Sequence, residues 1–351
     1  RCAVYSLDNG GMPQPPERPH DVQHLVVPWA ASLSEACQQA LPALDAPQSL
    51  PHLRQLMRHL SQHDWLKGDE YDPTPPHERW LSHAMGGQGA PAPWAAIQAR
   101  TDGLAPEAGQ AWGLMTPCHW LMGHDHLTLL HPDELHLSDE DSHTLLDAIR
   151  PLFEDEGWAL HWAHATRWYV VHPTLPDLPT ASLDRLVGRN PDLWMPEHPQ
   201  ARLLKRLQAE VQMLLYQHPL NDARQEAGAF TVNSFWLSGC GLVPEAPQTS
   251  TPSQHAAPAA WTVADGLRQA LLRGDVPAWA QAWQTLDQGP LRQLAQAAAQ
   301  GQRVRLTLCG ERHALTLGPA PDAGWLHRSL GQLQRLIQPS NVSPSDLLRQ
   351  L

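Results

Sequence analysis

The chain has 351 residues, enough for two domains with large cores, so its stability requires neither disulfides nor a structural metal. Its net charge of −12 disfavours nucleic-acid binding, which normally needs clustered Lys and Arg. No apolar run approaches the roughly 18 residues of a membrane-spanning helix, and five widely spaced cysteines indicate reduced thiols in a cytoplasmic protein.

Aromatic usage is inverted, with 15 Trp against 3 Phe and 4 Tyr, and the chain also has 21 His and 34 Pro. A GC-rich genome accounts for most of this bias, so we do not treat the Trp- and His-rich stretch over 65–241 as functional in itself. The abundance of proline predicts short elements and many loops.

The N-terminal half of the chain contains several segments with clear patterns. Residues 1–21 hold four prolines without periodicity and are predicted to be a disordered tail. The apolar run 25–27 is typical of a buried strand. Helices are predicted over 34–41 and 50–60, and residues 112–130 look extended.

The central segments carry stronger signals. Ser138 has the spacing of a helix N-cap and predicts a helix over 139–156, kinked at Pro151. Alternating residues over 158–172 predict a β-hairpin. Apolar residues at helical spacing over 198–218 predict an amphipathic helix with a buried face.

The fold class expected from these elements is mixed α/β (α+β), with a sheet and amphipathic helices. A main domain is predicted over 22–243 and a linker rich in Pro, Ser and Thr over 244–260. Residues 261–351 are predicted to form a small C-terminal α/β unit, which includes strands over 303–308 and 313–317 and a helix over 325–337.

The densest cluster of metal-ligating residue types is a His-x-His pair close to a cysteine. On a strand, His124 and His126 project from one face, where two imidazoles can share a metal. Cys118, or a carboxylate such as Asp69 or Glu70, could complete the set. The spacing matches no zinc template, so hydrogen-bonded polar histidines are the alternative interpretation.

An acidic loop held by prolines follows the first helices. Asp69, Glu70 and Asp72 place three carboxylates within four residues, a set that could ligate a divalent cation or supply a general base. A solvated turn is the alternative interpretation.

The stretch 233–241 combines Ser238 and Cys240 with two glycines. Its backbone amides and the Ser238 hydroxyl could bind an anion, and Cys240 is a candidate nucleophile without an identifiable base. No Gly-x-Ser-x-Gly motif accompanies it, and the alternative is a tight structural turn.

Three arginines are candidates for binding a carboxylate or phosphate through bidentate hydrogen bonds, namely Arg185, Arg189 and Arg224. In the alternative interpretation, Asp184 and Asp222 hold these arginines in internal salt bridges.

Long strings in this order resemble the bacterial RpfE-type regulatory protein family. They are GDEYDPTPPHERW (68–80), TPCHW (116–120), DHLTLLHPDELHLS (125–138), LLDAIRPLFEDEGW (145–158), HPTLPDLPTASLDRLVGRN (172–190), RLLKRLQAEVQMLLYQHPLNDAR (202–224), VNSFWLSGCG (232–241) and LTLCGE (306–311). The resemblance implies a regulatory role without a defined reaction, and some relatives carry the label of cofactor-independent phosphoglycerate mutase.

A mutase of that kind resembles alkaline phosphatases and needs two metals, held by several Asp and His, and a phosphate-accepting Ser. No Asp-Gly or Asp-Ser follows the first strand here, where the chain reads Val26-Val27-Pro28-Trp29. We therefore expect a regulatory-type protein that binds a protein partner or a small anionic ligand. The alternative is a metal-dependent, phosphate-handling enzyme that uses a divalent metal.

Overall fold

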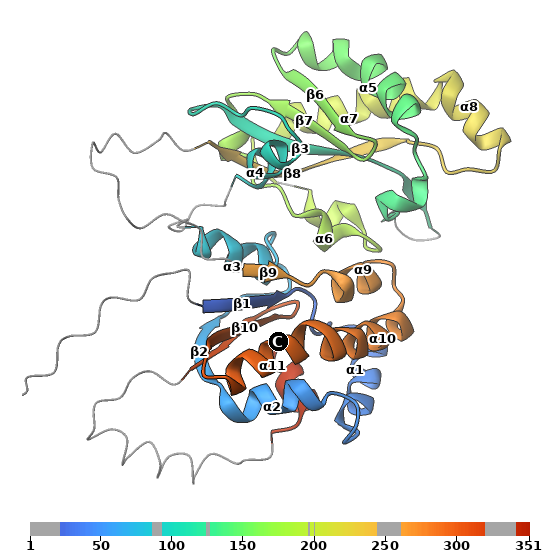
Figure 1. Ribbon diagram of the computed structural model, residues 1–351. Helices are drawn as coiled ribbons and strands as arrows, with labels where there is room; N and C mark the ends of the chain where they lie inside the picture. Colours follow the sequence, from blue (N-terminus) through green and yellow to red (C-terminus); the bar gives the residue numbers. More distant parts are fainter. Residues whose placement is uncertain are drawn as a thin grey trace, which may run out of the picture.

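The computed structural model describes residues 22–85, 93–123, 127–195, 197–199, 201–243, 261–319 and 342–351, and the structural statements below concern these residues. They form two lobes, each built around its own β-sheet (Figure 1). The fold is mixed α/β, as predicted. None of the helices in the described ranges is both long and apolar enough to cross a membrane.

The first lobe combines the two ends of the chain. Its sheet has the order β2-β11-β10-β1-β9. The strands are β1 (Val22–Val27), β2 (Ser61–Leu66), β9 (Trp261–Val263), β10 (Arg303–Cys309) and β11 (Ala314–Gly318). β1 runs parallel to both β9 and β10, whereas β11 is antiparallel to β10 and to β2. Three parallel strands therefore end at the same edge of this sheet.

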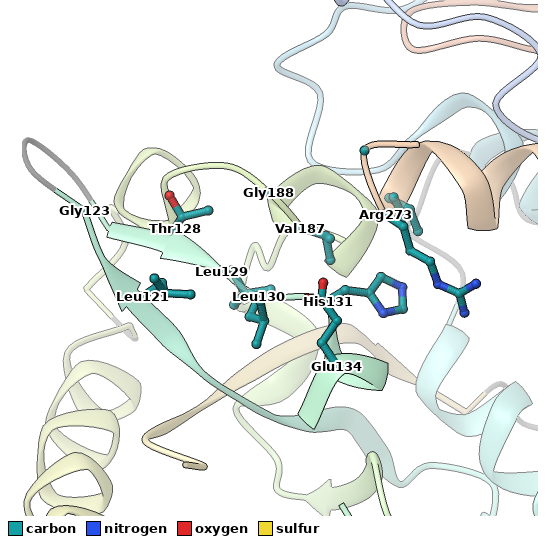
Figure 2. Close-up of a pocket in the computed structure, with 12 residues that line it drawn as sticks. Leu121, Gly123, Thr128, Leu129, Leu130, His131, Glu134, Val187, Gly188 and Arg273 are labelled. Atoms are coloured by element: carbon teal, nitrogen blue, oxygen red, sulfur yellow. The ribbon is translucent and has the colours of Figure 1, made fainter. Parts of the chain in front are cut away.

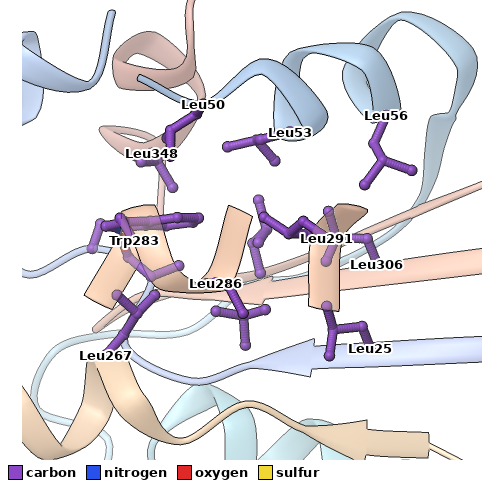
Figure 3. Close-up of a cluster of buried hydrophobic side chains, with 14 of the residues drawn as sticks. Leu25, Leu50, Leu53, Leu56, Leu267, Trp283, Leu286, Leu291, Leu306 and Leu348 are labelled. Carbon is purple, nitrogen blue, oxygen red and sulfur yellow. Dashed lines mark hydrogen bonds between the residues drawn. The ribbon is translucent and has the colours of Figure 1, made fainter. Parts of the chain in front are cut away.

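Helices cover the first sheet and enclose its core. They are α1 (Glu35–Ala40), α2 (Pro51–His59), α3 (Pro76–Ala84), α9 (Gly266–Leu272), α10 (Val276–Leu286), α11 (Arg292–Ala299) and α13 (Pro344–Leu348). Figure 3 shows how Leu53 and Leu56 of α2 meet Leu291, Leu306 and their neighbours. Burial of these leucines anchors the helices to the sheet by about 2 kcal/mol for each side chain.

The second lobe is built on the antiparallel sheet β6-β7-β3-β8. Its strands are β3 (Ala111–Cys118), β6 (Ala159–His164), β7 (Arg167–Val171) and β8 (Ser234–Leu242), and a separate hairpin joins β4 (Trp120–Met122) to β5 (Leu127–Leu129). Its helices are α4 (Trp94–Thr101), α5 (Asp139–Glu154), α6 (Leu183–Leu186), α7 (Ala201–Tyr216) and α8 (Pro219–Glu226). α5 and α7 pack on this sheet through a continuous apolar core.

Several local predictions are confirmed. The Ser34 and Ser138 side chains cap α1 and α5, and Pro151 lies inside α5. The predicted hairpin over 158–172 is the antiparallel pair β6–β7. The amphipathic helix predicted over 198–218 is α7, which begins three residues later and ends two residues earlier.

Two expectations differ from the structure. Residues 261–318 do not form a sheet of their own, because β9 and β10 pair in parallel with β1, so the predicted units 22–243 and 261–351 do not correspond to the two sheets. The stretch 233–241 is not a tight turn but lies mostly in β8. The predicted tail 1–21, the linker 244–260 and the helix 325–337 lie outside the described residues.

Candidate functional site

The carboxyl ends of the three parallel strands face the second lobe. Trp29 follows β1, Glu311 follows β10, and α9, which carries Arg268, follows β9. Open α/β sheets bind their ligands at this edge, because the loops that leave neighbouring strands diverge there. A ligand site is therefore expected at this edge of the sheet.

Side chains of the protein itself fill the edge. The buried Glu311 carboxylate accepts hydrogen bonds from the Ser32 hydroxyl (2.9 Å) and the Leu33 amide, and it pairs with Arg189 of the second lobe. The indole N–H of Trp29 donates to Asp184 of α6 at 3.1 Å. Residues of both lobes thus meet in one hydrogen-bonded network.

Asp184 and Arg185 of α6 are the centre of this network. Arg268 donates to both carboxylate oxygens of Asp184, at 2.5 and 2.6 Å. Although burial opposes it, the Arg268 guanidinium holds the pKa of Asp184 below its usual value. The fully buried Arg185 donates to the carbonyls of Glu311 (2.8 Å), Asp72 (2.9 Å) and Asp69 (3.3 Å). Burial lowers the pKa of Arg185.

A possible metal-ligand group lies beside Asp184. One ligand atom each of His77, Glu78 and Asp184 lie within 4.8 Å of one another. Burial lowers the pKa of His77 to about 4, so its imidazole is neutral at pH 7. Burial, together with the Asp184 carboxylate, raises the pKa of Glu78 to about 8. Among the described residues, this is the group of three that could hold a metal ion.

A pocket of about 350 Å³ opens next to the same network, where both lobes supply its wall (Figure 2). The second lobe contributes the β4–β5 hairpin and residues 187–188, and the first lobe contributes the end of α9. Its lining is largely apolar, with His131, Glu134 and Arg273 as the charged or titratable side chains. The Arg273 guanidinium is half exposed and pairs with Asp133 at 3.0 Å.

The predicted acidic loop is folded onto itself and onto arginines. Asp72 accepts hydrogen bonds from Arg79 (2.8 Å) and the Asp69 amide (2.9 Å), and Asp69 accepts one from the Tyr71 amide. The carbonyls of Asp69 and Asp72 bind Arg185. Glu70, the third acidic residue, is partly buried. The structure therefore brings the loop and Arg185 together, but through backbone carbonyls.

The other predicted anion-binding residues lie in different surroundings. Arg224 pairs with Asp141 at 3.3 Å and donates to the carbonyls of Phe230 and Leu135, within the second lobe. Ser238 is buried in β8. The salt bridges expected within this group exist with other partners, since Asp184 pairs with Arg268 and Arg224 with Asp141.

The two candidate cysteines are buried thiols. Burial raises the pKa of Cys240 to about 12 and also raises the pKa of Cys118, which packs in an apolar cluster with Trp236. A protonated, enclosed thiol is a weak nucleophile and a weak ligand. His124 and His126 lie outside the described residues.

Sequence reasoning missed most of the residues that form this junction. His77 and Glu78 lie within the string 68–80, and Glu311 within 306–311, but no local spacing distinguishes them. Their proximity depends on the pairing of β1 with β10 and on the packing of α6 against α3, which are contacts between distant parts of the chain. The one local sequence signal near His77 and Glu78 is Pro76, which is typical of the first residue of a helix and begins α3.

No protein-family model matches the chain, and no characterised protein matches it in sequence. The solved structures that resemble the chain include two at low sequence identity. A cofactor-independent phosphoglycerate mutase from Thermoplasma acidophilum DSM 1728 shares 14% identity over 87% of this chain and 91% of its own, with a TM-score of 0.35. The PH0037 protein from Pyrococcus horikoshii shares 13% identity over 86% of this chain and 88% of its own, with a TM-score of 0.42.

Proposed function

We propose that the chain is a cytoplasmic, regulatory-type binding protein, which takes a small ligand with an apolar body and one anionic group into the pocket between its lobes. The observation that carries this proposal is that both lobes line the pocket. A ligand seated there contacts both lobes at once, so its binding stabilises their junction.

The lining defines the chemistry of the ligand. Leu121, Leu129, Leu130 and Leu272 offer apolar surface, and Arg273 provides a cation at the wall. The Arg273 guanidinium is held by a half-exposed ion pair with Asp133, which contributes little stability in solvent. A ligand carboxylate or sulfonate can therefore compete with Asp133 for Arg273.

A displacement experiment tests this proposal. The fluorescent probe 1-anilinonaphthalene-8-sulfonate has an apolar body and one negative charge, and we expect it to bind the full chain and to be displaced by decanoate but not by decylamine. Arg273→Gln should weaken decanoate binding about tenfold, because it removes the charge-assisted contact. Thr128→Trp should abolish binding by filling the pocket.

Matched variants separate the pocket from the rest of the surface. Arg292→Gln removes an exposed arginine of α11 that does not line the pocket, and it should leave decanoate binding unchanged. Asp133→Asn frees Arg273 from its pair and should tighten binding. Equal displacement by decanoate and decylamine, or full binding by Thr128→Trp, would rule out this proposal.

A metal-dependent, phosphate-handling enzyme is a second candidate, and the His77–Glu78–Asp184 group favours it. The Ser182 hydroxyl lies 2.5 Å from the Glu78 carboxylate and is the nearest candidate to accept a phosphate. Turnover of a phosphoglycerate in the presence of Mn²⁺ that is lost in Ser182→Ala would support this function over the first.

A further inference from the structure

We propose that His77, Glu78 and Asp184 bind one divalent cation at the junction of the two lobes. His77 and Glu78 lie in the first turn of α3, and Asp184 belongs to α6 of the other lobe. Their ligand atoms lie within 4.8 Å of one another, so a small closure of the side chains would give the roughly 2 Å bonds of a Zn²⁺ or Mn²⁺ site.

The imidazole of His77 supplies the second, independent observation. Its side chain is 8% exposed, and Nε2 lies 3.4 Å from the Asp184 carboxylate. The other nitrogen, Nδ1, is buried and has no hydrogen-bond partner. With the proton on Nδ1, the lone pair of Nε2 points at the electron-rich Asp184 carboxylate, which is costly in a buried position. A cation bound between Nε2 and the carboxylate removes that cost.

Hydrogen bonds already orient both carboxylates. The Ser182 hydroxyl holds Glu78 at 2.5 Å, and Trp29 and Arg268 hold Asp184. Carboxylates that bind metals are usually held in this way by an outer set of donors. Each carboxylate oxygen has two lone pairs. Oδ2 of Asp184 accepts from Trp29 and Arg268, whereas Oδ1 accepts from Arg268 and keeps one lone pair that can bind a cation.

The ligand set defines the class of cation. One neutral imidazole and two carboxylates suit a transition-metal ion such as Zn²⁺ or Mn²⁺, whereas Mg²⁺ and Ca²⁺ prefer oxygen ligands alone. Because the ligands come from both lobes, the bound ion would join them. This inference holds whether or not the chain binds an anion in the neighbouring pocket or turns over a phosphate.

Titration calorimetry of the chelator-treated full chain with ZnCl₂, and separately with MgCl₂, tests the proposal. We expect one equivalent of Zn²⁺ to bind, with Mg²⁺ at least about a hundredfold weaker. His77→Ala should lower the Zn²⁺ affinity by at least about tenfold, because it removes one of three protein ligands. His59→Ala changes an exposed histidine at the end of α2 and should leave the affinity unchanged.

A second substitution guards against misfolding. Glu78→Gln keeps the shape of the side chain and its contact with Ser182 while it removes a group that can bind a cation as a carboxylate, and near-UV circular dichroism reports whether each variant keeps native packing. Wild-type affinity in folded Glu78→Gln, binding lost in His124→Ala but kept in His77→Ala, or the absence of stoichiometric Zn²⁺ binding would each overturn the proposal.

Discussion

At the scale of single residues, His24 of β1 makes the stability of the folded chain depend on pH. Its Nε2 lies 2.8 Å from the Thr307 hydroxyl, and its ring meets the edge of Trp80. Burial, with smaller contributions from Arg305 and His63, lowers the pKa of His24 to about 4. The folded chain therefore holds this imidazole neutral, whereas the unfolded chain protonates it near its usual pKa.

This lowered pKa makes the fold sensitive to acid. Neutral His24 contributes to the free energy of unfolding in full above the pKa of the unfolded chain, and this contribution is lost as the pH falls from about 6.5 toward 4. The loss amounts to about 2 kcal/mol between pH 8 and pH 5. Urea unfolding at both pH values should show that His24→Gln loses less stability on acidification than wild type by that amount. The exposed His59 supplies the control, since His59→Gln should keep the wild-type difference. If His24→Gln loses as much free energy of unfolding between pH 8 and pH 5 as wild type does, this explanation is wrong.

At the scale of elements, two glycines of β8 allow the start of α4 to pack closely against the strand. A Cβ placed on Gly241 would lie 2.8 Å from Pro93 Cα and 3.0 Å from Pro93 Cβ, and one on Gly239 would lie 3.0 Å from the Ala95 amide. The start of α4 thus approaches the backbone of β8 closely. Turn residues in a sequence and close-packing residues in a strand have the same composition, which is why a tight turn is one interpretation of the stretch 233–241 from sequence alone.

Gly241→Ala should therefore destabilise the second lobe by about 1–3 kcal/mol, because the added methyl group overpacks the contact with Pro93. Denaturant unfolding measures this cost. Gly289→Ala is the control, since a Cβ at Gly289 meets no atom within 4 Å. Gly289 lies in the helical segment Asp287–Leu291, where alanine is favoured over glycine, so this substitution should not destabilise the chain. Equal effects of the two substitutions would contradict the packing explanation.

Elements stabilised by neighbours in sequence were predictable. α1 and α5 begin at serine caps, and β6 and β7 follow each other directly, so local patterns identify them. The pairing of β1 with β10 joins residues about 280 positions apart in the chain, and no local pattern determines such a register. The candidate site could not be predicted from local sequence for the same reason, because Asp184 contacts His77 and Arg268 only once the two lobes are assembled.

At the scale of the whole molecule, polar contacts and an apolar cluster join the lobes. The contact of Asp184 with Arg268 is partly buried and that of Arg185 with the carbonyl of Glu311 is buried, so salt screens them less than exposed pairs. Trp29 and Leu272 of the first lobe pack with Leu129 of the second. The pocket is lined by residues next to these contacts, so occupancy of the pocket and stability of the junction are expected to be coupled.

Hydrogen–deuterium exchange with and without decanoate tests the central claim, that a ligand binds where the two lobes meet. We predict slower exchange at 127–131 in the second lobe and, at the same ligand concentration, at 271–274 in the first. Arg273→Gln should reduce both effects together. Protection confined to one lobe, or protection that Arg273→Gln leaves intact, would contradict this account.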